Sequence, residues 1–336
     1  MNLADMTNLE IEKEFSLKPF QAKQIYKWIR RGVTDASAMT DIPLALREKI
    51  KKEYEIYYPA VYMKFESKVD DTKKYLIKLQ DGNIVETVLM SYEHGYSVCV
   101  STQVGCRMGC AFCASTVDGL IRNLTPSEIE GQIRAVSSDA NVRVSNVVMM
   151  GIGEPMDNYD NVLKALHAIN NPDGLSIGFR HITLSTCGLT KGIKRLMEED
   201  IPITLALSLH ATEDEARRKI MPSSKNTTIS ELVSLMDEYA KKTKRRVSYE
   251  YSLIAGVNDS LLEAEKLGKL LKGQLCHVNL IEVNPVTGKD FKRGKNKYEF
   301  IKILDKYGVN ATLRRELGKD ISASCGQLKK SFVKED

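Results

Sequence analysis

The chain of 336 residues is 43% hydrophobic and 28% charged, a composition that supports a large buried core and excludes wholesale disorder. Its 49 Lys and Arg against 44 Asp and Glu give a formal net charge of +5, which is compatible with a nucleic-acid partner without indicating one. No apolar run approaches the roughly 18 residues of a membrane-spanning helix, and residues 1–15 carry acids where a secretory signal peptide would be basic and apolar. We therefore expect a soluble, cytoplasmic protein without a membrane partner.

The N-terminal part of the chain predicts a small helical unit that ends near Tyr58. Pro19 begins a segment whose apolar residues recur at helical spacing, and Leu44–Tyr54 indicates a further helix. Two segments of alternating polar and apolar residues follow, Lys74–Leu79 and Ile84–Met90. Because the turn-forming sequence Asp-Gly-Asn separates them, they predict a β-hairpin.

Beyond the hairpin, short β-rich segments alternate with helical patterns. The expected strands are Ser97–Thr102, Asn146–Met150, His181–Ser185, Ile203–Leu209, Val247–Leu253, Val278–Val283 and Asn310–Arg314, and the expected helices include Thr125–Val136, Asn161–Ile169, Ile229–Tyr239, Leu261–Leu271 and Glu299–Lys306. This alternation predicts parallel strands joined by crossover helices, in a doubly wound sheet or in a full or partial βα barrel. Residue propensity does not separate these two architectures.

Seven cysteines, an odd number, argue against a secreted disulfide scaffold. Cys106, Cys110 and Cys113 form the pattern C-x3-C-x2-C. A structural zinc site normally closes with four protein ligands, whereas three thiolates on a four-iron cluster leave one iron open to another molecule. The alternatives at this point are a zinc site completed by a distant Cys or His, and three unrelated buried thiols.

Other motifs accompany the cysteines in a fixed order. They are Cys99-Val-Ser-Thr-Gln-Val-Gly-Cys106, Phe112-Cys113-Ala-Ser-Thr, Arg122-Asn-Leu-Thr125, Met149-Met-Gly-Ile-Gly-Glu-Pro155, Thr183-Leu-Ser-Thr186, Ser208-Leu-His210, Asn279-Leu-Ile281 with Asn284-Pro285, and Asp320-Ile-Ser-Ala-Ser-Cys-Gly-Gln-Leu328. With Pro19–Gln24, they resemble the RlmN family, radical S-adenosylmethionine (SAM) methyltransferases of 23S rRNA and tRNA that are related to Cfr. The resemblance covers nearly the whole chain.

The resemblance implies a partial βα barrel of radical-SAM type with a small N-terminal helical domain and a short β-hairpin extension. The implied units are residues 1–58 for the helical domain, 59–95 for the extension, 96–316 for the barrel, and 317–336 for a C-terminal segment. It also implies a [4Fe–4S] cluster on Cys106, Cys110 and Cys113, whose open iron holds SAM. The SAM contacts carried over are Gly153, Glu154, Ser185, Ser208, Leu209, His210 and Asn284.

The predicted strands give a partial check on these contacts. Glu154, Ser208 and Asn284 each end or follow a predicted strand. In a βα barrel the carboxyl ends of the strands share one rim, where active sites are built. Taken singly, however, Gly-Glu-Pro is an ordinary turn, and a lone His is more often a core residue.

The resemblance implies roles for three further residues. Cys325 is the methyl carrier, which a first SAM methylates and a second SAM activates by a radical route. Glu86 is the base that removes the C2 proton of adenine, and Cys99 is the resolving thiol that forms a transient disulfide with Cys325. Without the resemblance, Cys325 would be a loop thiol, Glu86 a solvated hairpin residue and Cys99 a buried strand residue. Cys187 and Cys276 match no role.

The implied partners are 23S rRNA, at an adenine of the peptidyl-transferase centre, tRNA, and an electron donor such as flavodoxin or ferredoxin; we expect a monomer. Basic clusters at Lys27–Arg31, Lys241–Arg246 and Lys289–Lys297 suit phosphates, but they equally suit solvated surfaces. Ile152 stands where the family commonly has Met, and Pro155 favours methylation of C2 over the C8 reaction of Cfr. Two alternatives stay open: a Cfr-like C8 methyltransferase and a non-catalytic zinc-bearing RNA-binding module.

Overall fold

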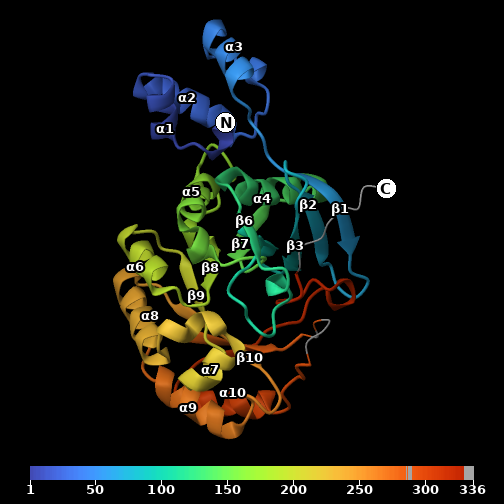
Figure 1. The fold of residues 1–336 in the computed structure, drawn as a ribbon, viewed down its shortest axis with the longest axis vertical. Coiled ribbons are helices and arrows are strands. Elements are labelled where there is room, and N and C mark those ends of the chain that lie inside the picture. The colour runs from blue at the N-terminus through green and yellow to red at the C-terminus, as the bar shows by residue number, and fades with distance from the viewer. Residues whose placement is uncertain (285, 287–289, 329–336) are drawn as a thin grey trace.

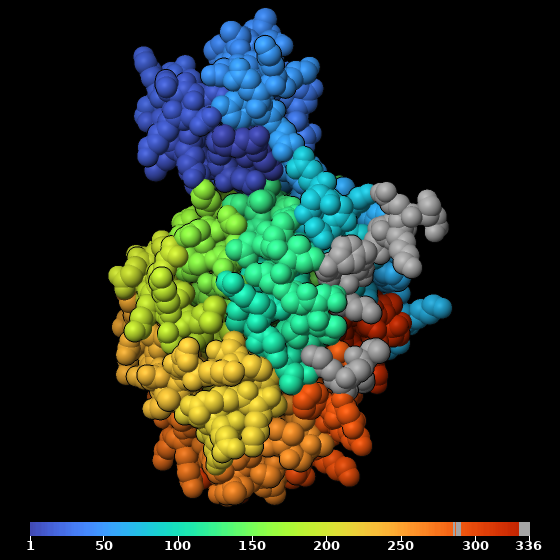
Figure 2. Space-filling model, viewed as in Figure 1, coloured from blue at the N-terminus to red at the C-terminus, as the bar shows by residue number. Residues whose placement is uncertain are grey.

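The computed structural model describes residues 1–284, 286 and 290–328. Its N-terminal lobe contains three α-helices, α1 (Asn8–Glu14), α2 (Pro19–Arg30) and α3 (Leu44–Glu53). The lobe has a hydrophobic core of its own, and Figure 2 shows it standing clear of the larger body. Sequence reasoning predicted α2 and α3 but missed α1, although Thr7 and Glu10 form a capping box at its start.

A buried ion pair joins the lobe to the body. Arg30, at the end of α2, meets Glu130 of α4 (Pro126–Ala140), and both side chains are almost fully buried. Arg134 binds the same carboxylate through Nε at 2.9 Å. Asn2 and Ser127 add a hydrogen bond of 2.9 Å close by. The lobe is therefore attached through a specific polar contact at the first half of α4 (Figure 1).

The body is built on a ten-stranded sheet in the order β1-β2-β3-β4-β7-β8-β9-β10-β11-β12. The strands are β1 (Ala60–Glu66), β2 (Lys73–Lys78), β3 (Ile84–Tyr92), β4 (Gly95–Cys99), β7 (Val144–Met149), β8 (Ile182–Thr186), β9 (Thr204–Ser208), β10 (Val247–Leu253), β11 (Cys276–Glu282) and β12 (Ala311–Leu313). From β4 to β12 neighbouring strands are parallel, and β1–β3 extend this sheet in antiparallel fashion.

The strand order distinguishes between the two architectures that the sequence left open. In a doubly wound sheet the order reverses at a switch point, and helices then cover both faces. Here the parallel strands follow one another from β4 to β12 without reversal. Since crossover connections are right-handed, all of these helices lie on the same face. Figure 1 shows them following one another around the outside, the arrangement of a partial βα barrel.

The crossover helices agree with most of the expected positions. Beside α4 they are α5 (Tyr159–Asn170), α6 (Thr190–Glu198), α7 (Asp214–Ile220), α8 (Ile229–Thr243), α9 (Leu261–Leu271) and α10 (Lys297–Lys306). Thr125 caps α4 together with Glu128, as its sequence predicted. β1, α6, α7 and a small separate pair, β5 (Gln103–Gly105) with β6 (Leu120–Asn123), were not expected.

The two faces of the sheet differ in chemistry. Leu184, Leu207 and Tyr251 belong to the main hydrophobic core beneath the helices. On the concave face Ser208 lies opposite Glu250 in the β9–β10 register, and both residues line a cavity. Because successive residues of a strand point to opposite faces, the polar residues between the core positions collect on the concave side. Among the residues described, no helix is long and apolar enough to span a membrane.

Candidate active site

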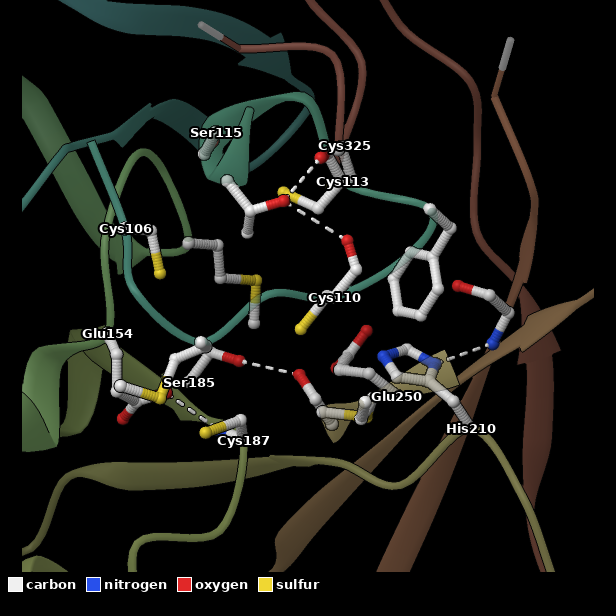
Figure 3. A pocket seen from close by; sticks show the side chains of 18 of the residues that line it. Cys106, Cys110, Cys113, Ser115, Glu154, Ser185, Cys187, His210, Glu250 and Cys325 are labelled. Atoms are coloured by element: carbon white, nitrogen blue, oxygen red, sulfur yellow. Dashed lines mark hydrogen bonds between the residues drawn. The ribbon is translucent and has the colours of Figure 1, made fainter. Parts of the chain in front are cut away.

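A cavity of about 160 Å³ lies at the carboxyl ends of the parallel strands. Its wall brings together Cys106, Cys110, Cys113, Gly153, Glu154, Ser185, Ser208, His210, Asn284 and Cys325. Figure 3 shows the three clustered cysteines facing Glu154, Ser185 and His210 across this space. Sequence positions more than 200 residues apart thus converge on one site, as the rim of a βα barrel predicts.

The cysteine loop, residues Cys106–Cys113, is fixed by backbone hydrogen bonds. The amide of Cys106 donates to the carbonyl of Gly119 at 2.9 Å, and that of Ala111 donates to Ile220 at 2.8 Å. Gly105 has φ +76° and approaches Gly119 so closely that a Cβ would lie 1.9 Å from its carbonyl oxygen. Only glycine fits at this position, so the local chain path that presents Cys106 depends on it.

The donor set of the loop suits an iron–sulfur cluster. Burial raises the pKa of Cys106 to about 12 and raises the pKa of Cys110 as well, so both remain thiols until a metal displaces their protons. Within the described part of the chain, no three His, Cys, Asp or Glu side chains converge on a single metal ion. The three thiols instead face a shared cavity whose wall also carries polar side chains, among them Glu154, Ser185 and Ser208 (Figure 3).

Glu154 follows β7 and is held by its neighbours. Its two carboxylate oxygens accept hydrogen bonds from the amides of Met156 at 3.0 Å and Cys187 at 2.7 Å. Burial raises the pKa of this carboxyl, and these hydrogen bonds act against that rise. The preceding Gly153 has φ +110° and packs so tightly that a Cβ would lie 2.7 Å from the Cβ of Gln103. Glu154 is thus a fixed acceptor suited to an ammonium group.

Ser185, Ser208 and His210 lie at the ends of β8 and β9. The two serine hydroxyls are 3.5 Å apart. His210 accepts the amide of Ser252 on Nδ1 at 2.9 Å, and burial lowers its pKa to about 3, so the ring is neutral and its proton is on Nε2. Leu209 is fully buried and does not line the cavity; its carbonyl accepts a hydrogen bond from a neighbouring arginine instead.

The segment Gly318–Leu328, which is named the carrier segment because it carries Cys325, contributes Cys325 and Gly326 to the cavity wall. Asn284, after β11, donates from Nδ2 to the carbonyl of Cys325 at 2.9 Å. The amide of Ala114 donates to Gly326 at 2.8 Å, and Ser115 donates to Leu328 at 2.7 Å. Cys325 therefore lies beside the cysteine loop (Figure 3). Pro285, which follows Asn284 in the family motif, and residues 329–336 lie outside the described residues.

Cys99 is the last residue of β4 and lies just outside the cavity wall. It is buried, and burial raises its pKa to about 12, with a smaller effect in the same direction from the nearby Cys325 thiol. Arg314 acts against this rise because its positive charge favours the thiolate form of Cys99. Both cysteines are free thiols in the structure. The Cys325 thiol is therefore within electrostatic range of Cys99.

Glu86 lies on β3 and is 3% exposed, so the interpretation of this residue as part of a solvated hairpin face is wrong. The carboxylate pairs with Lys74 of β2 at 3.3 Å, and its backbone carbonyl accepts the hydroxyl of Ser101 at 2.7 Å. Val88 pairs with Cys99 across β3 and β4, and Glu86 is two residues from Val88. Glu86 and Cys99 therefore point to the same concave face, although Glu86 does not line the cavity.

Comparison with known proteins agrees with this geometry. Residues 100–268 match the model of the radical SAM superfamily, and residues 1–56 match that of the ribosomal RNA large subunit methyltransferase N-terminal domain. The chain is 49% identical over 338 residues to a probable dual-specificity RNA methyltransferase RlmN of Clostridium botulinum, covering 99% of this chain and 97% of that relative. The chain belongs to the RlmN family of radical SAM enzymes.

Two further matches support the RlmN family fold. A probable RlmN of Clostridioides difficile is 50% identical over 96% of this chain and 95% of its own length. The crystal structure of a radical SAM methyltransferase from Sphaerobacter thermophilus superposes with a TM-score of 0.89 at 40% identity, covering 98% of this chain and 99% of that one. The expected radical-SAM fold with its N-terminal helical domain is confirmed. Membership of the superfamily also implies an iron–sulfur cluster and SAM.

Sequence reasoning missed several residues of the cavity wall. Cys187, which matched no role, lines the cavity beside Glu154, as do Glu250 and Arg314. Arg314 and Glu250 form an ion pair at 3.3 Å on the concave face. Arg314 ends the predicted strand Asn310–Arg314 and Cys187 lies two residues beyond the predicted strand His181–Ser185, so the strand-end rule that supported Glu154 could have found them. Glu250 lies inside β10, and nothing in its local sequence distinguishes it from a surface acid.

The basic clusters are largely engaged in contacts within the protein. Arg30 of the first cluster is buried with Glu130, and Lys242 of the second pairs with Glu198 at 2.9 Å. In the third, Arg293 pairs with Glu316, while Lys289 lies outside the described residues. At least one charge of each cluster is therefore paired within the protein.

Proposed function

We propose that this chain methylates C2 of adenine in 23S rRNA and in tRNA, with Cys325 as the methyl carrier. One observation supports this most strongly: the cysteine loop, the candidate SAM contacts and Cys325 line the same cavity. A methyl group that SAM brings into this cavity would therefore be close to the Cys325 thiol, which lines the same wall. The curated relatives carry the description "dual-specificity RNA methyltransferase", which agrees with two RNA substrates.

The binding roles follow from the donor set. Cys106, Cys110 and Cys113 would hold a [4Fe–4S] cluster, which with bound SAM supplies the methyl group and the one-electron chemistry that the electron-poor C2 position requires. Glu154 offers a fixed carboxylate to the ammonium group of SAM. Ser185, Ser208 and Asn284 offer hydroxyl and amide groups, and the neutral ring of His210 offers an N–H donor. Leu209 would contribute only through its backbone.

The transfer steps use three residues of the chain. The Cys325 sulfur carries the one-carbon unit as a methyl group. As the carbon of this group bonds to C2, it gives up one hydrogen atom, which the 5′-deoxyadenosyl part of bound SAM would accept, and the odd electron left on the adduct would pass to the cluster. Glu86 accepts the C2 proton, for which its ion pair with Lys74 has to open. The Cys99 thiolate then attacks the Cys325 sulfur, so an S–S bond forms and the S–C bond breaks. The electron pair of the broken bond stays on carbon, which gains a proton and becomes the methyl group.

The test is mass spectrometry of anaerobically reconstituted protein. Incubation with SAM should add one methyl group to the peptide containing Cys325, and labelled methyl should then appear at C2 of adenine in digested tRNA and rRNA. Cys325→Ala should abolish both signals, while Cys276→Ala, which changes a buried thiol of β11 outside the cavity wall, should keep them. Methyl at C8 would support the Cfr-like alternative, and stoichiometric zinc without iron would support the RNA-binding module.

A further inference from the structure

Arg217 of α7 is a buried cation without a carboxylate partner. Its side chain is 1% exposed, and none of the ion pairs among the described residues includes it. Nε donates to the carbonyl of Leu209 at 3.0 Å, and Nη2 donates to those of Cys187 at 2.7 Å and Ser208 at 2.9 Å. Nη1 is buried and has no hydrogen-bond partner. A charge buried in this way is costly unless an anion compensates it.

The surroundings of Arg217 point to where that anion belongs. Burial lowers the pKa of Arg217, and the groups that oppose this, in order, are the thiols of Cys187 and Cys110 and the carboxylate of Asp214. The chain after Arg217 packs directly on the cysteine loop, because Ile220 accepts the amide of Ala111 and Met221 belongs to the same hydrophobic cluster as Cys106. Arg217 therefore lies behind the loop, close to Cys110.

We propose that Arg217 is the counter-charge of the iron–sulfur cluster and sets its reduction potential. This inference rests on the proposed function, since it assumes that the cysteine loop holds the cluster. A four-iron cluster on three thiolates carries a net negative charge, which increases when it accepts an electron. A fixed cation nearby favours the reduced form, because net charge and hydrogen bonds are among the factors that set cluster potentials. Arg217 would thereby make reduction by the electron donor easier.

The competing explanation is purely structural: Arg217 only ties together the ends of β8 and β9 through three carbonyl groups. Two substitutions separate the effect of the positive charge from the effect of the three hydrogen bonds to carbonyl groups. Arg217→Lys keeps the cation but cannot bridge the three carbonyls in the same way, and Arg217→Met removes the cation at similar length. Arg218, the next residue on α7, is exposed, so Arg218→Met makes the same charge change away from the loop.

The experiment is a redox titration of reconstituted protein, followed by electron paramagnetic resonance, with iron content measured in parallel. Arg217→Met should shift the midpoint potential to more negative values, so that several-fold less cluster is reduced at the wild-type midpoint. Arg217→Lys and Arg218→Met should stay near the wild type. If Arg217→Met fails to bind iron while Arg217→Lys binds it fully, the charge is required for assembly, which also supports the proposal.

Other outcomes would contradict the proposal that Arg217 sets the reduction potential of the cluster. Equal midpoints for Arg217→Met and Arg217→Lys with full iron content would show that the charge has no effect on the cluster. Equal loss of iron in both variants would show that only the three carbonyl contacts matter. A failure of the proposed function is distinguishable from these results, because the wild-type protein itself would then bind no iron–sulfur cluster.

Discussion

The cysteine loop and the carrier segment line the same cavity, but they are held in different ways. The loop follows β5, and backbone hydrogen bonds tie it to Gly119 and to Ile220 at the end of α7. The carrier segment has no strand and only a short 3-10 helix, Lys319–Ile321. Polar side chains hold much of it, including Asn284 on the Cys325 carbonyl and Asp70 on the amide of Gly318 at 3.0 Å.

This difference corresponds to the two tasks of the proposed reaction. A cluster site needs fixed ligands, which backbone hydrogen bonds between regular elements provide. A methyl carrier has to meet SAM, an RNA base and Cys99 in turn. Single side-chain hydrogen bonds contribute about 1 kcal/mol each, so they can be exchanged for others at low cost. The site thus combines a rigid half with a half whose contacts are individually weak.

The largest expected effect on iron binding and activity comes from a substitution in the cysteine loop. Cys110→Ala removes one of three thiolates, so we expect both iron binding and RNA methylation to be abolished. Iron and sulfide analysis with a methylation assay measures this, and Cys276→Ala should behave as the wild type. Full iron content in Cys110→Ala would mean that the cysteine loop is not the cluster site.

The next effect concerns resolution by Cys99. Cys99→Ala should form the covalent protein–RNA adduct but not release it, so that the reaction stops after at most one turnover. A denaturing gel with labelled RNA detects the adduct directly. Free methylated RNA produced at the wild-type rate would remove Cys99 from the mechanism.

A moderate effect is expected from loosening the carrier segment. Asn284→Asp replaces the amide donor with a second acceptor facing the Cys325 carbonyl. Loss of this contact should slow methyl transfer roughly tenfold, equivalent to about 1.4 kcal/mol, without changing iron content. The exposed Asn310 provides the control, since Asn310→Asp makes the same chemical change outside the cavity wall. An unchanged rate in Asn284→Asp would mean that this hydrogen bond does not hold the carrier.

The smallest effect is on the pH dependence of stability. Burial lowers the pKa of His210 to about 3 from its ordinary 6.5, so below pH 6.5 the unfolded chain binds a proton that the folded chain does not. Stability should therefore fall as pH falls, by at most about 1.4 kcal/mol per pH unit from this residue. Asn tolerates the positive φ of residue 210, and His210→Asn should reduce this slope in urea unfolding of iron-free protein. An identical slope would place the acid sensitivity elsewhere.

Much of the half of the site that is formed by the cysteine loop and the parallel strands could be predicted from the sequence. The parallel strands are buried apolar segments, and the rule that active sites lie at their carboxyl ends agreed with the positions that the resemblance implied for Glu154 and Ser208. β1 was not predictable in the same way, because nearly all of its residues are exposed and show no apolar alternation. Without the resemblance, Glu86 was taken for a solvated hairpin residue, because its partner Lys74 is on another strand and pairing between strands cannot be seen in a local pattern.

The carrier segment was least accessible to sequence reasoning. Cys325 was located by resemblance alone, since the segment has no periodicity and its contacts come from distant parts of the chain. Arg217 illustrates the same limit. In the sequence it belongs to the charged run Glu213–Lys219, and its burial becomes visible only when α7 packs on the cysteine loop.

The buried ion pairs that Arg30 and Arg134 both form with Glu130 affect how this protein can be engineered. Removing residues 1–58 would expose Glu130 and Arg134 and would take away Arg30, whose charge they pack against. The truncated body would therefore lose solubility or stability along with the lobe. A chimaera that exchanges the lobe for that of a relative would need to retain the arginine at the end of α2. The helical lobe and the surface of α4 are thus complementary, and the lobe cannot be removed without also redesigning the surface that it covers.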